Sequence, residues 1–242
     1  IISNCIRSVT IGLTGGLLSR SAKSSTSLER KSYKKIMRYS ACFAFLTDMS
    51  MVLLGSKLKR KESLSARLGD MLSNLYILTS CLKYFSHSKD KAEESPILEW
   101  VADSIFFDLE ASITGIIDNL PLKFMRPVFR FICLPLGKRA KKPSDELLDK
   151  ITKLFTNPTT VRDRILDNGS IAADTNNPMG FAIQSLEKVI AVEDLERKLY
   201  KAVKSGQVTG LSLEEQLRSA TATGLLTEQQ AQNLIEVDKI RT

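Results

Sequence analysis

Apolar residues recur at spacings of three and four along most of the chain, which is the pattern of amphipathic helices. The clearest stripe runs through one segment and comprises Leu64, Leu68, Met71, Leu72, Leu75, Leu78, Leu82 and Phe85. A long helix is predicted before it, from Leu28 to Leu54 with Gly55 as its C-terminal cap. Another is predicted after it, from Ile97 to Leu120, where Pro121 stops it.

The last part of the chain also has a helical pattern, in shorter segments. A helix is predicted over Phe181–Lys204, and the pairs Ser212 with Glu215 and Thr227 with Gln230 match capping boxes. No run of alternating apolar residues is long enough to predict a strand. The expected fold class is therefore all-α, an antiparallel helical bundle followed by a smaller helical tail.

Charge divides the chain at the Gly137–Pro143 linker. Residues 1–142 carry 23 basic and 12 acidic side chains, whereas residues 143–242 carry 12 basic and 15 acidic ones. We therefore expect two parts, a basic helical bundle over 1–142 and a smaller, mildly acidic helical subdomain over 143–242.

The composition excludes several kinds of site. His87 is the sole histidine, so a multi-histidine metal centre within the chain is excluded. The four cysteines form no Cys-x-x-Cys pair, which leaves neither a zinc knuckle nor a redox dithiol, and fits a reducing compartment. No catalytic, cofactor-binding or metal-binding residue is predicted.

Neither a signal peptide nor a transmembrane span is predicted. No basic region precedes an apolar core at the start of the chain, which reads instead as a fragment of a longer protein. The longest apolar stretch, Ala41–Leu54, contains Asp48, and an unpaired carboxylate is costly at that depth in lipid.

Two segments are candidates for contact with anions or a lipid surface. The first is a compact cationic cluster formed by Lys57, Lys59, Arg60 and Lys61. It has the charge to meet phosphates of CoA, anionic lipid headgroups or nucleic acid. The alternative, which stays open, is an ordinary solvated loop between two helices.

The second candidate is the segment Leu122–Leu136, which Pro127 and Pro135 break into a short helix or turns. It mixes aromatic rings with cations, and more cations follow in the linker: Phe124, Arg126, Phe129, Arg130, Phe131, Lys138 and Arg139. One interpretation is an interfacial anchor whose rings enter lipid while the cations meet phosphates. The other is packing against the bundle or against a missing part of the parent protein.

Several segments in order resemble the C-terminal region of bacterial long-chain, FadE-type acyl-CoA dehydrogenases. They are RYSACFAFLTDMSM (38–51), LGSKLKRKE (54–62), SARLGDMLSNLY (65–76), LPLGK (134–138), PSD (143–145) and NPMG (177–180). The resemblance covers nearly the whole chain. It implies that residues 1–142 span the end of the dehydrogenase helical region and the start of a C-terminal extension.

The resemblance implies a parent enzyme that oxidises a fatty acyl-CoA to its trans-2-enoyl-CoA with FAD as the hydride acceptor. The family's base is a glutamate that precedes a glycine, and this chain has no Glu-Gly dipeptide. We therefore expect the fragment to be inactive by itself, with FAD, the acyl-CoA substrate and the catalytic residues held by upstream domains of the same protein.

The expected role is assembly and membrane-surface docking. The similar helical extension of very-long-chain acyl-CoA dehydrogenases is associated with dimer contacts and inner-membrane attachment. By this likeness we expect a homodimer in the bacterial cytoplasm, peripheral at the inner membrane. The alternative is a free-standing basic helical module that binds nucleic acid or an acidic partner. It rests on net charge alone, because no nucleic-acid motif is present, and no specific nucleic acid is expected.

Overall fold

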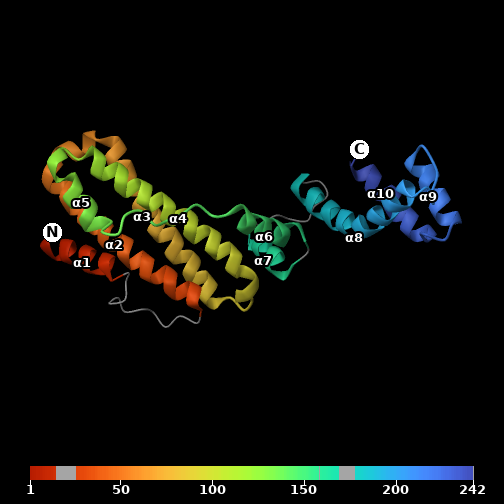
Figure 1. Cartoon of the computed structure of the whole chain (residues 1–242), viewed down its shortest axis with the longest axis horizontal. Coiled ribbons are helices and arrows are strands. Elements are labelled where there is room, and N and C mark those ends of the chain that lie inside the picture. Colours follow the sequence, from red (N-terminus) through yellow and green to blue (C-terminus); the bar gives the residue numbers. More distant parts are fainter. Residues whose placement is uncertain (15–25, 158, 169–177, 242) are drawn as a thin grey trace. The chain divides into compact units, whose positions relative to one another are not determined.

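A computed structural model describes residues 1–14, 26–157, 159–168 and 178–241 of the chain. Within these ranges the chain forms ten α-helices and two short 3-10 helices, and no strand (Figure 1). The prediction of an all-α protein is therefore confirmed.

The contacts divide the chain into two compact units, Ile1–Ile151 and Thr152–Thr242. The helices of the first unit are α1 (Ile2–Leu13), α2 (Ser27–Leu54), η1 (Gly55–Arg60), α3 (Glu62–His87), α4 (Lys91–Asn119), η2 (Lys123–Met125), α5 (Arg126–Cys133) and the start of α6 (Asp145–Thr156). The boundary between the units lies inside α6, beyond the linker at which the charge changes.

Helices α2, α3 and α4 run side by side and form the body of the first unit (Figure 1). Short connections make consecutive helices antiparallel neighbours. Their apolar stripes meet in one core, where Leu46, Leu78 and Leu109 have no exposed surface. The stripe predicted on α3 is buried except at Leu72, which is 56% exposed, and Leu68, which is partly buried.

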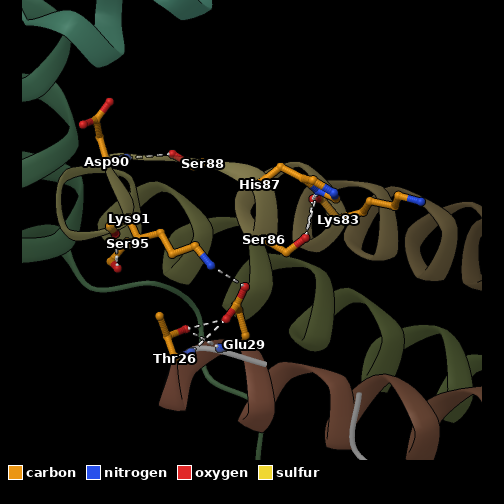
Figure 2. Close-up of polar contacts among 9 residues, drawn as sticks. All are labelled: Thr26, Glu29, Lys83, Ser86, His87, Ser88, Asp90, Lys91 and Ser95. Carbon is orange, nitrogen blue, oxygen red and sulfur yellow. Dashed lines mark hydrogen bonds and ion pairs between the residues drawn. The ribbon is translucent and has the colours of Figure 1, made fainter. Parts of the chain in front are cut away.

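Both ends of α2 follow their sequence signals. The Thr26 hydroxyl accepts from the Glu29 N–H at 3.2 Å, and the Glu29 carboxylate accepts from the Thr26 N–H at 2.9 Å, which completes a capping box. Glu29 is fully buried and also pairs with Lys91 at 3.3 Å (Figure 2), so one carboxylate ties the start of α2 to the start of α4. At its other end Gly55 caps α2 with a positive φ of 49°.

Helix α4 begins earlier than the sequence predicted. It starts at Lys91 rather than at Ile97, and Pro96 lies inside it. Glu93 and Glu94 lie in its first turn, where carboxylates are stabilised by the positive end of the helix dipole. This first turn carries few apolar residues, so hydrophobic periodicity did not reveal it.

The second unit has a core of its own. It holds the end of α6 together with α7 (Thr160–Asn168), α8 (Pro178–Lys204), α9 (Leu213–Ala222) and α10 (Glu228–Arg241), of which the last three pack together. Val192 and Leu199 of α8 are buried against Leu217 and Leu234. The predicted caps are present, since the Ser212 hydroxyl accepts from the Glu215 N–H at 3.3 Å. Thr227 and Gln230 exchange hydrogen bonds of 3.3 and 2.9 Å.

One helical stretch among the described residues, Ser27–Arg60, is long and apolar enough to cross a membrane by length and composition alone. A single such helix is weak evidence of a span, because the core helix of a soluble protein meets the same criterion. Here α2 packs against α1, α3, α4 and α5, and Asp48 accepts a hydrogen bond from the Asn4 amide at 2.8 Å.

Candidate functional site

The segment made of η2 and α5 presents apolar rings to solvent. Phe124 is 76% exposed and Phe131 is 55% exposed, and Val128 and Leu136 are exposed beside them. Monomeric domains rarely leave large apolar side chains grouped on one surface without a partner. The exposed face of α5 is therefore the strongest candidate in the first unit for a surface that binds a partner.

Phe129, the third phenylalanine of this segment, lies in the core instead. Its side chain is 2% exposed, and its ring packs edge-on against Phe45 with 5.9 Å between the centroids. On a helix, residues 129 and 131 point to different sides, so one ring faces the bundle while the other faces water. The apolar surface is formed without Phe129.

The inner side of α5 is fixed by hydrogen bonds to its carbonyl groups. The Ser8 hydroxyl of α1 donates to the Ile132 carbonyl at 3.0 Å, and the Cys42 thiol of α2 donates to the Cys133 carbonyl at 3.2 Å. A hydrogen bond with Cys42, together with burial, raises the pKa of the Cys133 thiol well above its usual value. A thiol that keeps its proton is unreactive, so the Cys133 side chain is not a candidate nucleophile. The Cys42 thiol serves to position α5 through its hydrogen bond to the Cys133 carbonyl.

The cations of this segment lie at the edge of the apolar face. Arg126 reaches back to the Leu120 carbonyl at 3.4 Å, and Arg130 pairs with Asp118 at 2.6 Å. Both partners of the Arg130 pair are at least 40% exposed, so the pair contributes little to stability and is easily exchanged for another anion.

The predicted cationic cluster lies on η1 and at the residue after it. Lys57, Lys59, Arg60 and Lys61 are all exposed, whereas Leu58 between them packs against the core and anchors the turn. The Leu58 carbonyl accepts from the Ser65 hydroxyl at 3.1 Å, which holds η1 against the start of α3. Within the described part of the chain, none of the four cations has an ion-pair partner.

The fold brings the two candidate segments to the same end of the bundle. Because α2, α3 and α4 alternate in direction, the end of α4 lies beside the start of α3. Asn119 accordingly lines a cavity together with Arg60 and Lys61. Its neighbour Asp118 pairs with Arg130 of α5. Figure 1 shows the turn between α2 and α3 at the same end as α5.

We call this end of the bundle the basic end. It comprises Lys57, Lys59, Arg60, Lys61, Phe124, Arg126, Val128, Arg130 and Phe131. It combines exposed apolar rings with cations that come from two parts of the sequence far apart.

Lys138 and Arg139 lie farther along the bundle, on the linker that follows α5. The backbone N–H groups of Arg139 and Ala140 donate to the carboxylate of Glu110, at 3.0 Å each. Glu110 is buried and accepts a further hydrogen bond from the Tyr39 hydroxyl at 2.8 Å. Burial and the nearby carboxylate raise the pKa of Tyr39. Glu110 thus holds the linker against α4 while the Lys138 and Arg139 side chains stay exposed.

The sequence did not predict a site role for Glu110 or Arg67. Glu110 lies among the buried residues of α4, so the signal that marks it is a carboxylate within an apolar stripe. Arg67 has no such signal, because its place depends on Gly115 of α4. A Cβ at Gly115 would lie 2.7 Å from the Arg67 Nε.

The single histidine has a local role. The Nδ1 atom of His87 lies 2.8 Å from the Lys83 carbonyl and 3.1 Å from the Ser86 hydroxyl, at the exposed end of α3 (Figure 2). Among the described residues no group of three histidine, cysteine, aspartate or glutamate side chains is placed to hold a metal ion.

Comparison with known families identifies what the chain resembles as a whole. The family model described as acyl-CoA dehydrogenase, C-terminal, bacterial type, matches residues 1–242. No solved structure matches the chain.

Proposed function

The chain belongs to the bacterial-type C-terminal family of acyl-CoA dehydrogenases, and from this membership we propose that it is a non-catalytic helical domain that docks the flavoenzyme onto an anionic membrane surface. The observation that carries the proposal is the basic end, where two exposed phenylalanines lie at the same end of the bundle as six cations. On this proposal the enzyme lies at the cytoplasmic face of the bacterial inner membrane.

The family implies FAD and a fatty acyl-CoA in the parent enzyme, where the flavin accepts the hydride. The described residues do not fit a flavin site. Gly12, near the end of α1, serves helix packing rather than phosphate binding, because Pro135 Cγ lies 2.9 Å from the position of a Gly12 Cβ. We therefore assign the flavin contacts and the catalytic base to upstream catalytic domains of the parent, and none to the residues described.

The physical case for a membrane rests on the mixture of side chains. Transfer of a phenylalanine ring from water to an apolar environment is favourable by about 1.5–3 kcal/mol of free energy. A ring at the level of the lipid headgroups gains part of that free energy. Each cation near an anionic leaflet adds about 1 kcal/mol. Phe124 and Phe131 supply the first contribution, and the unpaired cations of η1 supply the second.

Co-sedimentation with vesicles tests this proposal. We expect the 242-residue chain to bind vesicles of phosphatidylcholine and phosphatidylglycerol, to bind phosphatidylcholine alone weakly, and to be released by salt. The double variant Phe124→Ser, Phe131→Ser should lose about tenfold or more in affinity, because both rings leave the contact. Equal, salt-insensitive recovery with both vesicle types would contradict docking.

A matched control is available at the other end of α3. Tyr84 is 50% exposed there, so Tyr84→Ser removes an exposed aromatic ring outside the basic end. It should leave vesicle binding unchanged.

Assembly is the other role proposed for this domain, through a homodimer and through contact with the upstream catalytic domains. The same apolar face would serve a second subunit. If the phenylalanine double variant halves the mass in light scattering and leaves vesicle binding intact, the face is a subunit interface and membrane docking is excluded. Retention of the vesicle-bound fraction in the presence of competing DNA separates docking from the alternative of a nucleic-acid-binding module.

A further inference from the structure

A cavity of about 360 Å³ lies at the junction of η1, α3 and the end of α4. This volume is within the roughly 300–1,000 Å³ range of small-ligand sites. Its lining is mostly polar and includes three cations: Arg60, Lys61, Glu62, Ser63, Leu64, Arg67 and Asn119. Three cations and one carboxylate therefore face the same space.

Arg67 is held in the wall of this cavity by contacts with both α3 and α4. Its Nη1 donates to the Ser63 carbonyl at 3.1 Å, one turn earlier on α3. The Arg67 side chain lies against α4 at Gly115, where a Cβ would come within 2.7 Å of Nε and 3.0 Å of Cδ. A side chain at residue 115 would displace Arg67, so this glycine creates the space that Arg67 occupies.

The amide of Asn119 completes the wall on the α4 side. Its Nδ2 donates to the Gly115 carbonyl at 2.7 Å, which fixes the amide one turn after the glycine. Gly115 thus supports both a cation from α3 and an amide from α4 at the rim of the same cavity.

The positive charge of the cavity is not balanced within the described part of the chain. Arg60, Lys61 and Arg67 have no ion-pair partner there, and Glu62 pairs with none of them. Cations held close together without a counterion repel one another, and a bound anion removes that repulsion. Guanidinium groups bind phosphate through parallel N–H donors, which favours phosphate over chloride.

We propose that this cavity binds a phosphate group through Arg60, Lys61 and Arg67, with Gly115 holding Arg67 in place. The phosphate chemistry is common to two sources, the headgroup of an anionic phospholipid and the phosphates of CoA. The proposed site shares Arg60 and Lys61 with the basic end, but it does not depend on insertion of the phenylalanines into lipid, because none of its residues lies on α5.

Calorimetric titration of the 242-residue chain with inorganic phosphate, at constant ionic strength set with chloride, tests the proposal. Arg67→Gln removes a charged donor, and we expect phosphate to bind about tenfold more weakly. Gly115→Ala keeps every charge but displaces Arg67, and we expect a loss of the same order.

Gly69→Ala is the matched control. Gly69 lies on α3 with open space around it, so the change adds the same methyl group to a helix without meeting another side chain. Alanine favours a helix over glycine at both positions, so circular dichroism should show a retained fold in both variants. Wild-type phosphate affinity in Arg67→Gln or in Gly115→Ala, or no phosphate binding by the wild type, would overturn the proposal.

Two further titrations distinguish the sources of the phosphate. Dihexanoyl phosphatidylglycerol below its micelle concentration presents a lipid headgroup, and CoA compared with dephospho-CoA presents a terminal phosphate. The source that displaces inorganic phosphate from the wild type, and not from Arg67→Gln, is the one that the cavity recognises. Displacement that is the same in both proteins would contradict the assigned residues.

Discussion

Glu110 shows how much one buried side chain determines in this unit. Its carboxylate accepts hydrogen bonds from the Tyr39 hydroxyl and from the N–H groups of Arg139 and Ala140. These bonds join α2, α4 and the linker that follows α5. A buried acceptor with several donors is costly to replace, because each donor loses its partner in a place that water does not reach.

Glu110→Gln tests that role. Glutamine keeps the volume but offers a single acceptor oxygen, so at least one donor is left unpaired. We expect the free energy of unfolding to fall by about 2 kcal/mol, measured by urea denaturation. Glu99→Gln on the exposed side of the same helix is the control and should leave the stability unchanged. An unchanged stability in Glu110→Gln would contradict the role assigned to the carboxylate.

Tyr39 gives a prediction about alkaline pH. Burial and Glu110 raise the pKa of Tyr39 above its ordinary value of 10.0 in the folded state, so the folded chain keeps the phenol proton that the unfolded chain releases. The stabilisation is present below about pH 10 and is lost as the pH rises from there toward the raised pKa, by about 1.4 kcal/mol per unit. Tyr39→Phe removes this contribution.

Denaturation curves between neutral pH and pH 11 check this prediction. The free energy of unfolding should fall more steeply above pH 10 in the wild type than in Tyr39→Phe. Parallel curves would mean that the Tyr39 pKa is the same in the folded and unfolded chain.

Individual side chains also show where sequence patterns stop. The cations of η1 were identifiable from their spacing, and the structure leaves them exposed. Phe129 was grouped with Phe124 and Phe131 because the sequence alone does not fix the rotation of so short a helix. Arg67 depends on a glycine far along the chain, and only the packing of α3 against α4 brings the two together.

At the scale of an element, α5 is divided between two roles. One side is held by α1 and α2 through its carbonyl groups, and the other presents Phe131 and Val128 to solvent. Substitution of the buried Phe129 should therefore mainly lower stability, whereas substitution of the exposed Phe131 should mainly weaken vesicle binding.

Phe129→Ala should destabilise the chain by about 3–5 kcal/mol, because a buried ring leaves a cavity next to Phe45. Phe131→Ala should leave the melting temperature nearly unchanged and weaken vesicle binding. Thermal denaturation followed by vesicle co-sedimentation measures both. The assignment of the two faces of α5 is wrong if the two variants show the same loss of stability.

Helix limits were predictable where capping signals and periodicity agree. The end of α2 at Gly55 and the starts of α9 and α10 follow from a glycine or single side chains. The capping box at Thr26 was not among the predicted caps, so α2 was predicted to begin at Leu28. The start of α4 was not predictable, because its first turn is polar and Pro96 indicated a later beginning. Two acidic residues, Glu93 and Glu94, indicate a first helical turn too weakly to predict one where the apolar stripe is missing.

At the scale of the whole molecule, the chain contains two cores that share no residue. Leu199 belongs to the core of the second unit and is 6% exposed. Leu199→Ala should destabilise that core by about 2–5 kcal/mol.

Hydrogen exchange followed by mass spectrometry localises the effect. We expect faster exchange in α8, α9 and α10, with the rates of α2, α3 and α4 unchanged. Faster exchange throughout both units would show that the two cores unfold as one.

The fold class was predictable from periodicity, and the family from ordered sequence segments that the family model covers in full. The basic end was not predictable as one surface. Its two segments are separated by the whole of α3 and α4, and they meet because these helices return the chain to the same end of the bundle. A sequence pattern identifies each segment, whereas only the antiparallel packing joins them.

Quenching by brominated lipids tests the central claim most directly. Trp100, the single tryptophan, lies on α4 outside the basic end, so Trp100→Phe with Phe131→Trp places the sole indole on the exposed face of α5. We predict strong quenching of this reporter by vesicles that contain brominated phosphatidylglycerol, and little quenching of Trp100 in the wild type. Equal quenching of the two reporters, or none at residue 131, would contradict docking through the basic end.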